Sequence, residues 1–227
     1  MQIEPIFRDR ADAGRRLADR LARTTNDPTT IVLGLPRGGV PVAFEVARSL
    51  EAELDVFLVR KLGLPGQEEL AIGAIASGGV RILNESLIRE LQLSKSLIDR
   101  ITAREEYELK RREDLYRQGR PGVPVRNRAA ILVDDGLATG ASMKAACRAL
   151  RLQGPRRIVV AVPVAARETC DEFRIDVDEI VCAFTPTPFL AVGIWYEDFS
   201  QTTDEEVQRL LEQAERGATG VAPVQGR

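Results

Sequence analysis

The sequence predicts an α/β protein built on a doubly wound, mainly parallel sheet. Short apolar segments alternate with amphipathic segments along most of the 227-residue chain. Several of the apolar segments are apolar at consecutive positions, as strands covered on both faces require. Hydrophobic residues make up 44% of the chain and charged residues 29%. This balance indicates one compact domain, or one domain with a small appendage.

The elements of the first half are assigned from periodicity and from the glycines and prolines that bound them. They are a helix over 9–23, a buried strand over 29–35, a glycine turn and helix over 36–50, a strand over 54–61, an exposed loop over 62–69, one or two strands over 70–83 broken at Gly78-Gly79, and a long helix over 94–119. The long helix carries many charges of both signs. We interpret them as a solvated face, with a dimer surface or phosphate-facing arginines as the alternative.

The second half continues the alternation. It predicts a strand over 128–135, a helix over 140–154, a strand over 157–166, a short helix over 166–173, a strand over 178–184, an irregular aromatic segment over 185–203 and a helix over 204–216. We therefore expect a core at 1–184, a C-terminal segment and helix at 185–216, and a disordered tail at 217–227.

Composition narrows the classes of function. The formal net charge of −2 disfavours a general nucleic-acid binder. The absence of histidine argues against zinc sites and against Ser-His-Asp or Cys-His catalysis. Cys147, Cys170 and Cys182 form no C-x-x-C pattern, so we expect buried free thiols in a reducing cytoplasm. No apolar run approaches the roughly 18 residues of a membrane span, and the N-terminus has no signal-peptide core.

Two strand–loop–helix junctions carry glycine loops of the kind that bind anions. They read IVLGLPRGGVPVA at 31–43 and ILVDDGLATGASM at 131–143. Glycine lets the backbone approach a ligand, and the helix N-terminus that follows offers unpaired N–H groups and partial positive charge. Either loop alone is also compatible with a plain βα turn, and neither matches a P-loop or a dinucleotide fingerprint.

Asp134 and Asp135 stand directly before the second loop. A ligand there must therefore interact with two carboxylates and also with a loop that is suited to binding an anion. A carboxylate and a phosphate ~6 Å apart repel by roughly 2–3 kcal/mol at an effective dielectric of about 20. The carboxylates are therefore expected to accept hydrogen bonds from hydroxyls or to face a cation. A sugar phosphate satisfies both halves, and Mg²⁺ suits the site because it prefers hard oxygen ligands.

The segment ILVDDGLATGASM resembles the binding signature for phosphoribosyl pyrophosphate (PRPP) in type I phosphoribosyltransferases. That signature has apolar residues, two acids and a glycine/threonine-rich loop, and the wording here is most similar to the adenine phosphoribosyltransferase version. A Walker B strand is disfavoured because the P-loop lysine motif is absent. A receiver domain is disfavoured because the acidic pair lies late in the chain. The resemblance covers roughly residues 30–200, is fair at 34–40 and 58–66, and is weak after 185.

The resemblance implies a type I phosphoribosyltransferase-like core, with a small C-terminal hood, and roles for particular residues. The 5′-phosphate would lie on Gly136, Leu137, Ala138, Thr139, Gly140, Ala141 and Ser142. Asp134 and Asp135 would hold the ribose hydroxyls, and would reach Mg²⁺ indirectly, through those hydroxyls or water. Pyrophosphate would lie on Pro36, Arg37, Gly38, Gly39 and Arg60, and Lys61 would neutralise it as it departs.

The resemblance carries further expectations. The Pro36–Arg37 peptide is expected to be cis or strained, and a flexible loop at about 62–80 to close over PRPP. Phe189 or Trp195 would stack on the base, with packing of these aromatics against the core as the alternative. Ala138 stands where hypoxanthine-guanine members carry a catalytic aspartate, so Glu69 becomes the candidate general base.

The implied reaction transfers a 5-phosphoribosyl group from Mg²⁺-PRPP to a nitrogenous base and releases pyrophosphate, as in nucleotide salvage. Its transition state resembles an oxocarbenium ion. The implied partners are PRPP, a small-molecule base and a second copy of the chain in a homodimer, with no membrane and no nucleic acid. A non-catalytic regulator that senses PRPP or nucleotides on the same fold is the alternative. A PRPP-synthesising kinase is disfavoured because that assembly is longer and has a duplicated core.

Overall fold

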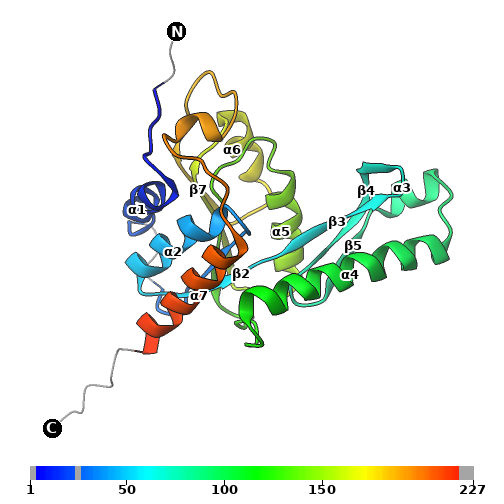
Figure 1. Cartoon of the computed structure of the whole chain (residues 1–227). Helices are drawn as coiled ribbons and strands as arrows, with labels where there is room; N and C mark the ends of the chain where they lie inside the picture. The colour runs from blue at the N-terminus through cyan, green and yellow to red at the C-terminus, as the bar shows by residue number, and fades with distance from the viewer. Residues whose placement is uncertain (1–3, 24–26, 220–227) are drawn as a thin grey trace.

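The computed structural model describes residues 4–23 and 27–219, with positions 68, 69, 218 and 219 described by their backbone alone (Figure 1). The strands are β1 Ile31–Gly34, β2 Glu53–Val56, β3 Val59–Leu64, β4 Gln67–Ala76, β5 Val80–Leu83, β6 Ala129–Val133, β7 Arg157–Val164 and β8 Glu179–Phe184. The helices are α1 Arg10–Leu21, α2 Gly39–Leu50, α3 Glu85–Glu90, α4 Lys95–Arg117, α5 Ala141–Arg151, α6 Arg167–Phe173 and α7 Asp204–Thr219, with a 3-10 turn at Gly193–Trp195. None of the helices in these ranges is long and apolar enough to cross a membrane.

A five-stranded parallel sheet forms the centre of the molecule, with the strand order β2-β1-β6-β7-β8. Strands β1 and β6 are buried at every position because helices cover both faces. Ile31 and Leu33 share a buried cluster with Met143 of α5, whereas Val32 shares one with Leu17 of α1. Successive side chains of a strand point to opposite faces, so β1 contributes to both layers. The predicted doubly wound, mainly parallel sheet is confirmed.

A smaller antiparallel sheet, β3-β4-β5, projects from this core together with α3 and α4 (Figure 1). We call these elements the arm. The exposed loop expected at 62–69 is corrected here, because strands β3 and β4 occupy most of these positions as a hairpin. Closure of the segment at about 62–80 over a ligand stays a prediction. The predicted break at Gly78-Gly79 is confirmed, since it separates β4 from β5.

Buried side chains explain why this segment is ordered as strands. Leu62 and Ile72 are fully buried and share an apolar cluster with Ile98 and Ile101 of α4. Gly66 takes the turn between the two strands with a φ of 80°, a value that glycine adopts without steric cost. The polar residues around this turn favour a loop when the sequence is considered alone. The strands form because the apolar residues between them pack against the long helix α4.

Side-chain caps mark the helix starts. Asp9 Oδ1 accepts a hydrogen bond from the Asp12 amide at 2.7 Å, which begins α1. Ser94 Oγ accepts one from the Leu97 amide at 3.3 Å, which begins α4. The long helix ends at Arg117, and Gln118, which caps it, has a φ of 51°. The predicted helices at 9–23 and 94–119 therefore form within about two residues of their expected bounds.

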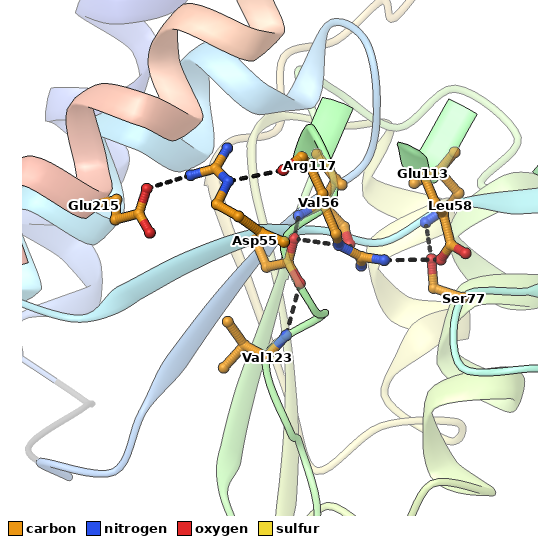
Figure 2. Close-up of polar contacts among 9 residues, drawn as sticks. Asp55, Val56, Leu58, Ser77, Glu113, Arg117, Val123 and Glu215 are labelled. Atoms are coloured by element: carbon orange, nitrogen blue, oxygen red, sulfur yellow. Dashed lines mark hydrogen bonds and ion pairs between the residues drawn. The ribbon is translucent and has the colours of Figure 1, made fainter. Parts of the chain in front are cut away.

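The last turn of α4 is tied to the edge strand β2 by a buried ion pair, drawn in Figure 2. Arg117 Nε donates to Asp55 Oδ1 at 2.9 Å, and Arg117 Nη2 donates to the Val56 carbonyl at 3.1 Å. Asp55 Oδ2 accepts from the Val123 amide at 2.9 Å, on the segment that returns from α4 to the core. Both connections between arm and core thus pass beside Asp55.

Residues 185–203, which we call the strap, pack on the N-terminal segment. The amides of Ile6 and Phe7 both donate to the Trp195 carbonyl at 2.9 Å, and the Glu197 amide donates to the Phe7 carbonyl at 2.8 Å. Trp195 and Tyr196 are buried in one cluster with Phe7. The first and last parts of the core are thereby held together, and a role of the strap as a hood over a base stays a prediction.

The final helix is longer than expected. The sequence predicts it over 204–216, but α7 extends to Thr219, so the first three positions of the expected tail at 217–227 are helical. Val207, Leu210 and Leu211 are buried and fasten α7 to the core. The rest of the expected tail, 220–227, lies outside the described residues.

The cysteines differ from expectation in one respect. Cys170 of α6 and Cys182 of β8 form a disulfide, so the prediction of three free thiols is wrong for this pair. Helix α6 leads into β8 and packs beside it, which brings the two side chains together although no sequence motif links them. Cys147 is free and buried, as predicted.

Candidate active site

The segment ILVDDGLATGASM forms the predicted strand–loop–helix junction between β6 and α5. Gly140 has a φ of 68°, which suits glycine, and the loop then enters α5. Thr139 and Ser142 are exposed, as phosphate ligands must be. Leu137 is buried, and its amide donates to the Val164 carbonyl at 3.0 Å. Because strand β7 already uses the Leu137 N–H group, this residue has no backbone donor left for a phosphate, and its expected place among the phosphate ligands stays a prediction.

The two glycine loops lie side by side because β1 and β6 are neighbours in the sheet. The Pro36–Arg37 peptide bond is cis, as the resemblance implied. A Cβ atom at Gly39 would lie 2.6 Å from the Val133 carbonyl oxygen and 2.9 Å from the Asp134 Cα atom. Only glycine allows such an approach of the first loop to the second.

The two aspartates of the second loop face different partners. Asp134 lines a cavity. Asp135 Oδ2 accepts a hydrogen bond from Arg10 Nε at 2.9 Å, and only 16% of its side chain is exposed. Burial, together with the charge of Asp135, raises the pKa of Asp134 well above its usual range. Burial also raises the pKa of Asp135, although the Arg10 guanidinium acts in the opposite direction.

The cavity beside Asp134 has a volume of about 140 Å³. It is lined by Leu35, Pro36, Phe57, Leu58, Val59, Arg60, Arg112, Asp134 and Ser142. The cavity thus joins the cis-peptide loop, the acidic strand end, the first turn of α5 and the arm. It combines one carboxylate, one hydroxyl and two guanidinium groups.

The two arginines of the cavity are each held by a glutamate of α4. Arg60 donates from Nε to Glu105 Oε2 at 2.6 Å, and Glu105 is 6% exposed. Arg112 donates from Nε to Glu108 Oε1 at 2.9 Å. Hydrogen bonds from Arg111 and Arg112 lower the pKa of Glu108 to about 2, so this carboxylate is ionised at neutral pH. Guanidinium groups held in this way are suited to a phosphate or diphosphate.

Lys61 does not share this cavity with Arg60. Neighbouring residues of a strand point to opposite faces, so Arg60 and Lys61 diverge. Lys61 lines a different cavity, of about 680 Å³, with Lys144 and Arg148 of α5. Arg60 and Lys61 were both expected at the pyrophosphate, but in this structure they line two different cavities.

Arg37 belongs to the cis-peptide loop but points towards the start of α7. Its Nη1 atom lies 3.8 Å from Asp204 Oδ1, and 36% of its side chain is exposed. Asp204 also accepts a hydrogen bond from the Tyr116 hydroxyl at 2.8 Å. Burial and this hydrogen bond raise the pKa of Tyr116 to about 12. Helices α4 and α7 thus meet beside the first glycine loop.

The base-binding candidates Phe189 and Trp195 do not line the cavity. Trp195 is 6% exposed and belongs to a buried cluster, as the packing alternative expects, and its stacking role stays a prediction. Phe189 is partly buried against the same cluster. Position 69 lies in β4, and the Glu69 side chain lies outside the described residues.

The donor set decides how a magnesium ion could be held. Within residues 4–23 and 27–219 no group of three or more acidic or cysteine side chains gathers as a metal site. One hard carboxylate, Asp134, does face the cavity. This set suits Mg²⁺ that keeps water and takes most of its ligands from a phosphate-bearing substrate.

Two residues of this region escaped the sequence reasoning. Arg10 lies 125 positions before its partner Asp135, and no local pattern joins them. Arg112 lies in the charged helix for which phosphate-facing arginines were the less favoured alternative. The sequence gives the charge of Arg112, but it does not show that Arg112 lies on the face of α4 that lines the cavity.

The chain is similar to one protein family, to curated proteins and to a solved structure. The family model described as "Phosphoribosyl transferase domain" matches residues 4–187. A Mycobacterium tuberculosis (strain H37Rv) protein named as a candidate phosphoribosyl transferase is 49% identical over 211 residues, which are 93% of this chain and 47% of that protein. The chain therefore spans about half the length of the curated relatives it matches. The crystal structure of TT1426 from Thermus thermophilus is 46% identical, with a TM-score of 0.81, over 91% of this chain and 98% of that chain.

Proposed function

Because this chain belongs to the phosphoribosyl transferase domain family, we propose that it transfers a 5-phosphoribosyl group from Mg²⁺-PRPP to a nitrogenous base and releases pyrophosphate. The observation that carries the proposal is the cavity in which Asp134, Ser142, Arg60 and Arg112 converge beside the cis-peptide loop. A sugar, a phosphate and a diphosphate would each find a suitable group there.

Each part of PRPP has a subsite in this proposal. The 5′-phosphate binds the exposed part of the second loop around Thr139 and Ser142, where α5 begins. The ribose hydroxyls donate hydrogen bonds to Asp134. In this arrangement the ribose lies between the Asp134 carboxylate and the 5′-phosphate, which keeps the two negative charges apart, as their electrostatic repulsion requires.

The leaving pyrophosphate carries the largest charge in the reaction. We assign its stabilisation to Arg60 and Arg112, with the cis-peptide loop at Pro36–Arg37 supporting it from the core. Bound Mg²⁺ would supply further neutralisation of the diphosphate oxygens. Lys61 keeps a role at the pyrophosphate only as a prediction that requires the arm to move.

The carboxylate near the ribose favours the positive charge that develops at the anomeric carbon as the C–O bond to pyrophosphate breaks. The acceptor nitrogen then bonds to that carbon and loses its proton to a base. Ala138 cannot take that proton, so Glu69 stays a prediction for this step, as does Phe189 for contact with the acceptor. Participation in nucleotide salvage, a homodimer and a cytoplasmic location also stay predictions.

The alternative is a regulator on the same fold that binds PRPP or a nucleotide without turnover. An assay of pyrophosphate release with PRPP and a panel of purines, pyrimidines and orotate distinguishes the two. Turnover of any acceptor supports the enzyme. Binding of PRPP without turnover of any acceptor supports the regulator.

The site itself is tested by titration calorimetry with PRPP and Mg²⁺. The double variant Asp134→Asn/Asp135→Asn should bind at least about tenfold more weakly, because it removes the charge that accepts the ribose hydroxyls. Asp171→Asn is the matched control, since Asp171 is exposed on α6 and pairs only weakly with Arg174 at 3.4 Å. Equal affinity in the wild type and the double variant would refute the ribose subsite.

A further inference from the structure

Arg10 is a partly buried cation at the start of α1 that reaches the acidic pair. Its Nε atom donates to Asp135 Oδ2 at 2.9 Å, and 12% of its side chain is exposed. Its Nη1 atom donates to the Ser200 carbonyl at 2.6 Å, and its guanidinium carbon lies 4.0 Å from the centre of the Phe199 ring. The side chain therefore has three partners, two of them on the strap, which hold it in one place.

The strap holds the same aspartate from its backbone side. The Tyr196 hydroxyl donates to the Asp135 carbonyl at 2.5 Å. Tyr196 in turn contacts the Phe199 ring, with a centroid distance of 5.0 Å. Both the side chain and the backbone of Asp135 are thus fixed by one unit made of the N-terminal segment and the strap.

This arrangement places the two adjacent carboxylates in different surroundings. Asp134 lines the cavity, whereas the Asp135 side chain points to Arg10. Two partly buried carboxylates without a cation would repel each other, and one would take up a proton or turn towards any available donor. The Arg10 guanidinium holds the Asp135 side chain and so leaves Asp134 as the carboxylate that lines the cavity.

We propose that Arg10 is a positioning residue for the acidic pair: by binding Asp135 it leaves Asp134 as the carboxylate that accepts the ribose hydroxyls. The proposal rests on the proposed function, because it concerns the ribose subsite of PRPP. Arg10 touches no substrate group in this scheme and acts only through Asp135. Its effect should therefore be confined to ligands that contain ribose.

The test compares three ligands by titration calorimetry: PRPP, ribose 5-phosphate and inorganic pyrophosphate. Arg10→Ala should weaken binding of PRPP and of ribose 5-phosphate by about tenfold, the scale expected when a charged hydrogen bond is lost. Its affinity for pyrophosphate should stay at the wild-type value, because Arg60 and Arg112 line the cavity from the arm and keep their glutamates. A loss of global structure would instead weaken all three ligands alike.

Two further variants sharpen the result. Arg10→Lys keeps the charge but cannot bridge Asp135 and Ser200 while it stacks on Phe199, so its ribose 5-phosphate affinity should lie between those of the wild type and Arg10→Ala. Adding Arg10→Ala to Asp135→Asn should cause no further loss, since a residue that acts through Asp135 has nothing to act on in that background.

The matched control is Arg16→Ala, on the same helix. Arg16 lies 3.2 Å from Asp12, and 46% of its side chain is exposed. It should bind all three ligands as the wild type does. Unchanged ribose 5-phosphate affinity in Arg10→Ala, or an equal loss for pyrophosphate, would overturn the role of Arg10. A wild-type protein that binds neither PRPP nor ribose 5-phosphate would instead overturn the proposed function on which it rests.

Discussion

Gly38 lies so close to Asp135 that a Cβ atom at position 38 would be 2.0 Å from the Asp135 Oδ2 atom. The same Cβ atom would be 3.2 Å from Arg10 Nε. Gly38 has a φ of −61°, so lack of space, not backbone conformation, is the reason for glycine at this position. The first glycine loop thus packs directly on the ion pair that holds the second.

Gly38→Ala should therefore damage the site more than the fold. The added methyl group must push Asp135 away from Arg10 or move the cis-peptide loop, and a displacement of about 1 Å in such a site can weaken function on the order of a hundredfold. We expect a loss of PRPP affinity of at least about tenfold, measured by calorimetry. The control is Gly217→Ala in α7, where nothing lies within 4 Å of the added Cβ atom. Equal PRPP affinities of these two variants would contradict the packing argument.

Arg112 and Arg111 allow a matched comparison on one helix. Both pair with Glu108, but only Arg112 lines the cavity. Arg112→Gln should weaken the binding of inorganic pyrophosphate by about tenfold, because it removes one of two guanidinium groups. Arg111→Gln should change it by less than about twofold, as expected for a surface charge. If the two variants behave alike, Arg112 does not contact the pyrophosphate.

The Asp55–Arg117 pair should stabilise the junction between arm and core (Figure 2). Asp55→Ala removes the acceptor of Arg117 Nε and of the Val123 amide and leaves Glu113, 3.0 Å from Arg117 Nη1, as the remaining carboxylate of this guanidinium. We therefore expect a loss of about 2 kcal/mol in the free energy of unfolding, measured with denaturant. The control is Glu215→Gln, which breaks the more exposed pair with Arg120 and should cost less than about 1 kcal/mol. Similar losses in both variants would show that the buried pair is no stronger than a surface pair.

Tyr116 should make the stability of the fold sensitive to high pH. Burial and the hydrogen bond to Asp204 raise its pKa from 10.0 to about 12. The folded state therefore binds this proton more tightly than the unfolded state. The resulting stability is fully present below pH 10 and is lost as the pH rises through about 12, with a total of about 3 kcal/mol.

The measurement is the free energy of unfolding of the wild type and of Tyr116→Phe between pH 8 and pH 12. The difference between the two proteins should shrink by about 2 kcal/mol over this range, because the variant has no hydroxyl to titrate. Tyr107→Phe is the control on the same helix, since Tyr107 is 74% exposed. Parallel curves for the wild type and Tyr116→Phe would contradict the raised pKa.

Much of this protein could be predicted from local sequence. The alternation of apolar and amphipathic segments determined the parallel sheet and the two strand–loop–helix junctions, because both depend on neighbours within a few positions. The contiguous segment ILVDDGLATGASM was sufficient to indicate the family, which the match to the family model then confirmed. The cis peptide at Pro36–Arg37 followed from the same resemblance.

The tertiary structure alone decided which side chains share the site. Arg10 reaches Asp135 across 125 positions, Arg112 enters the cavity from the arm, and Lys61 points to the opposite face of its strand from Arg60. Such relationships depend on how faces of helices and strands pack, and residue type alone does not encode them. The sequence by itself determined the glycines, hydroxyls and carboxylates of the second loop, whereas packing determined which aspartate lines the cavity and which is held by a cation.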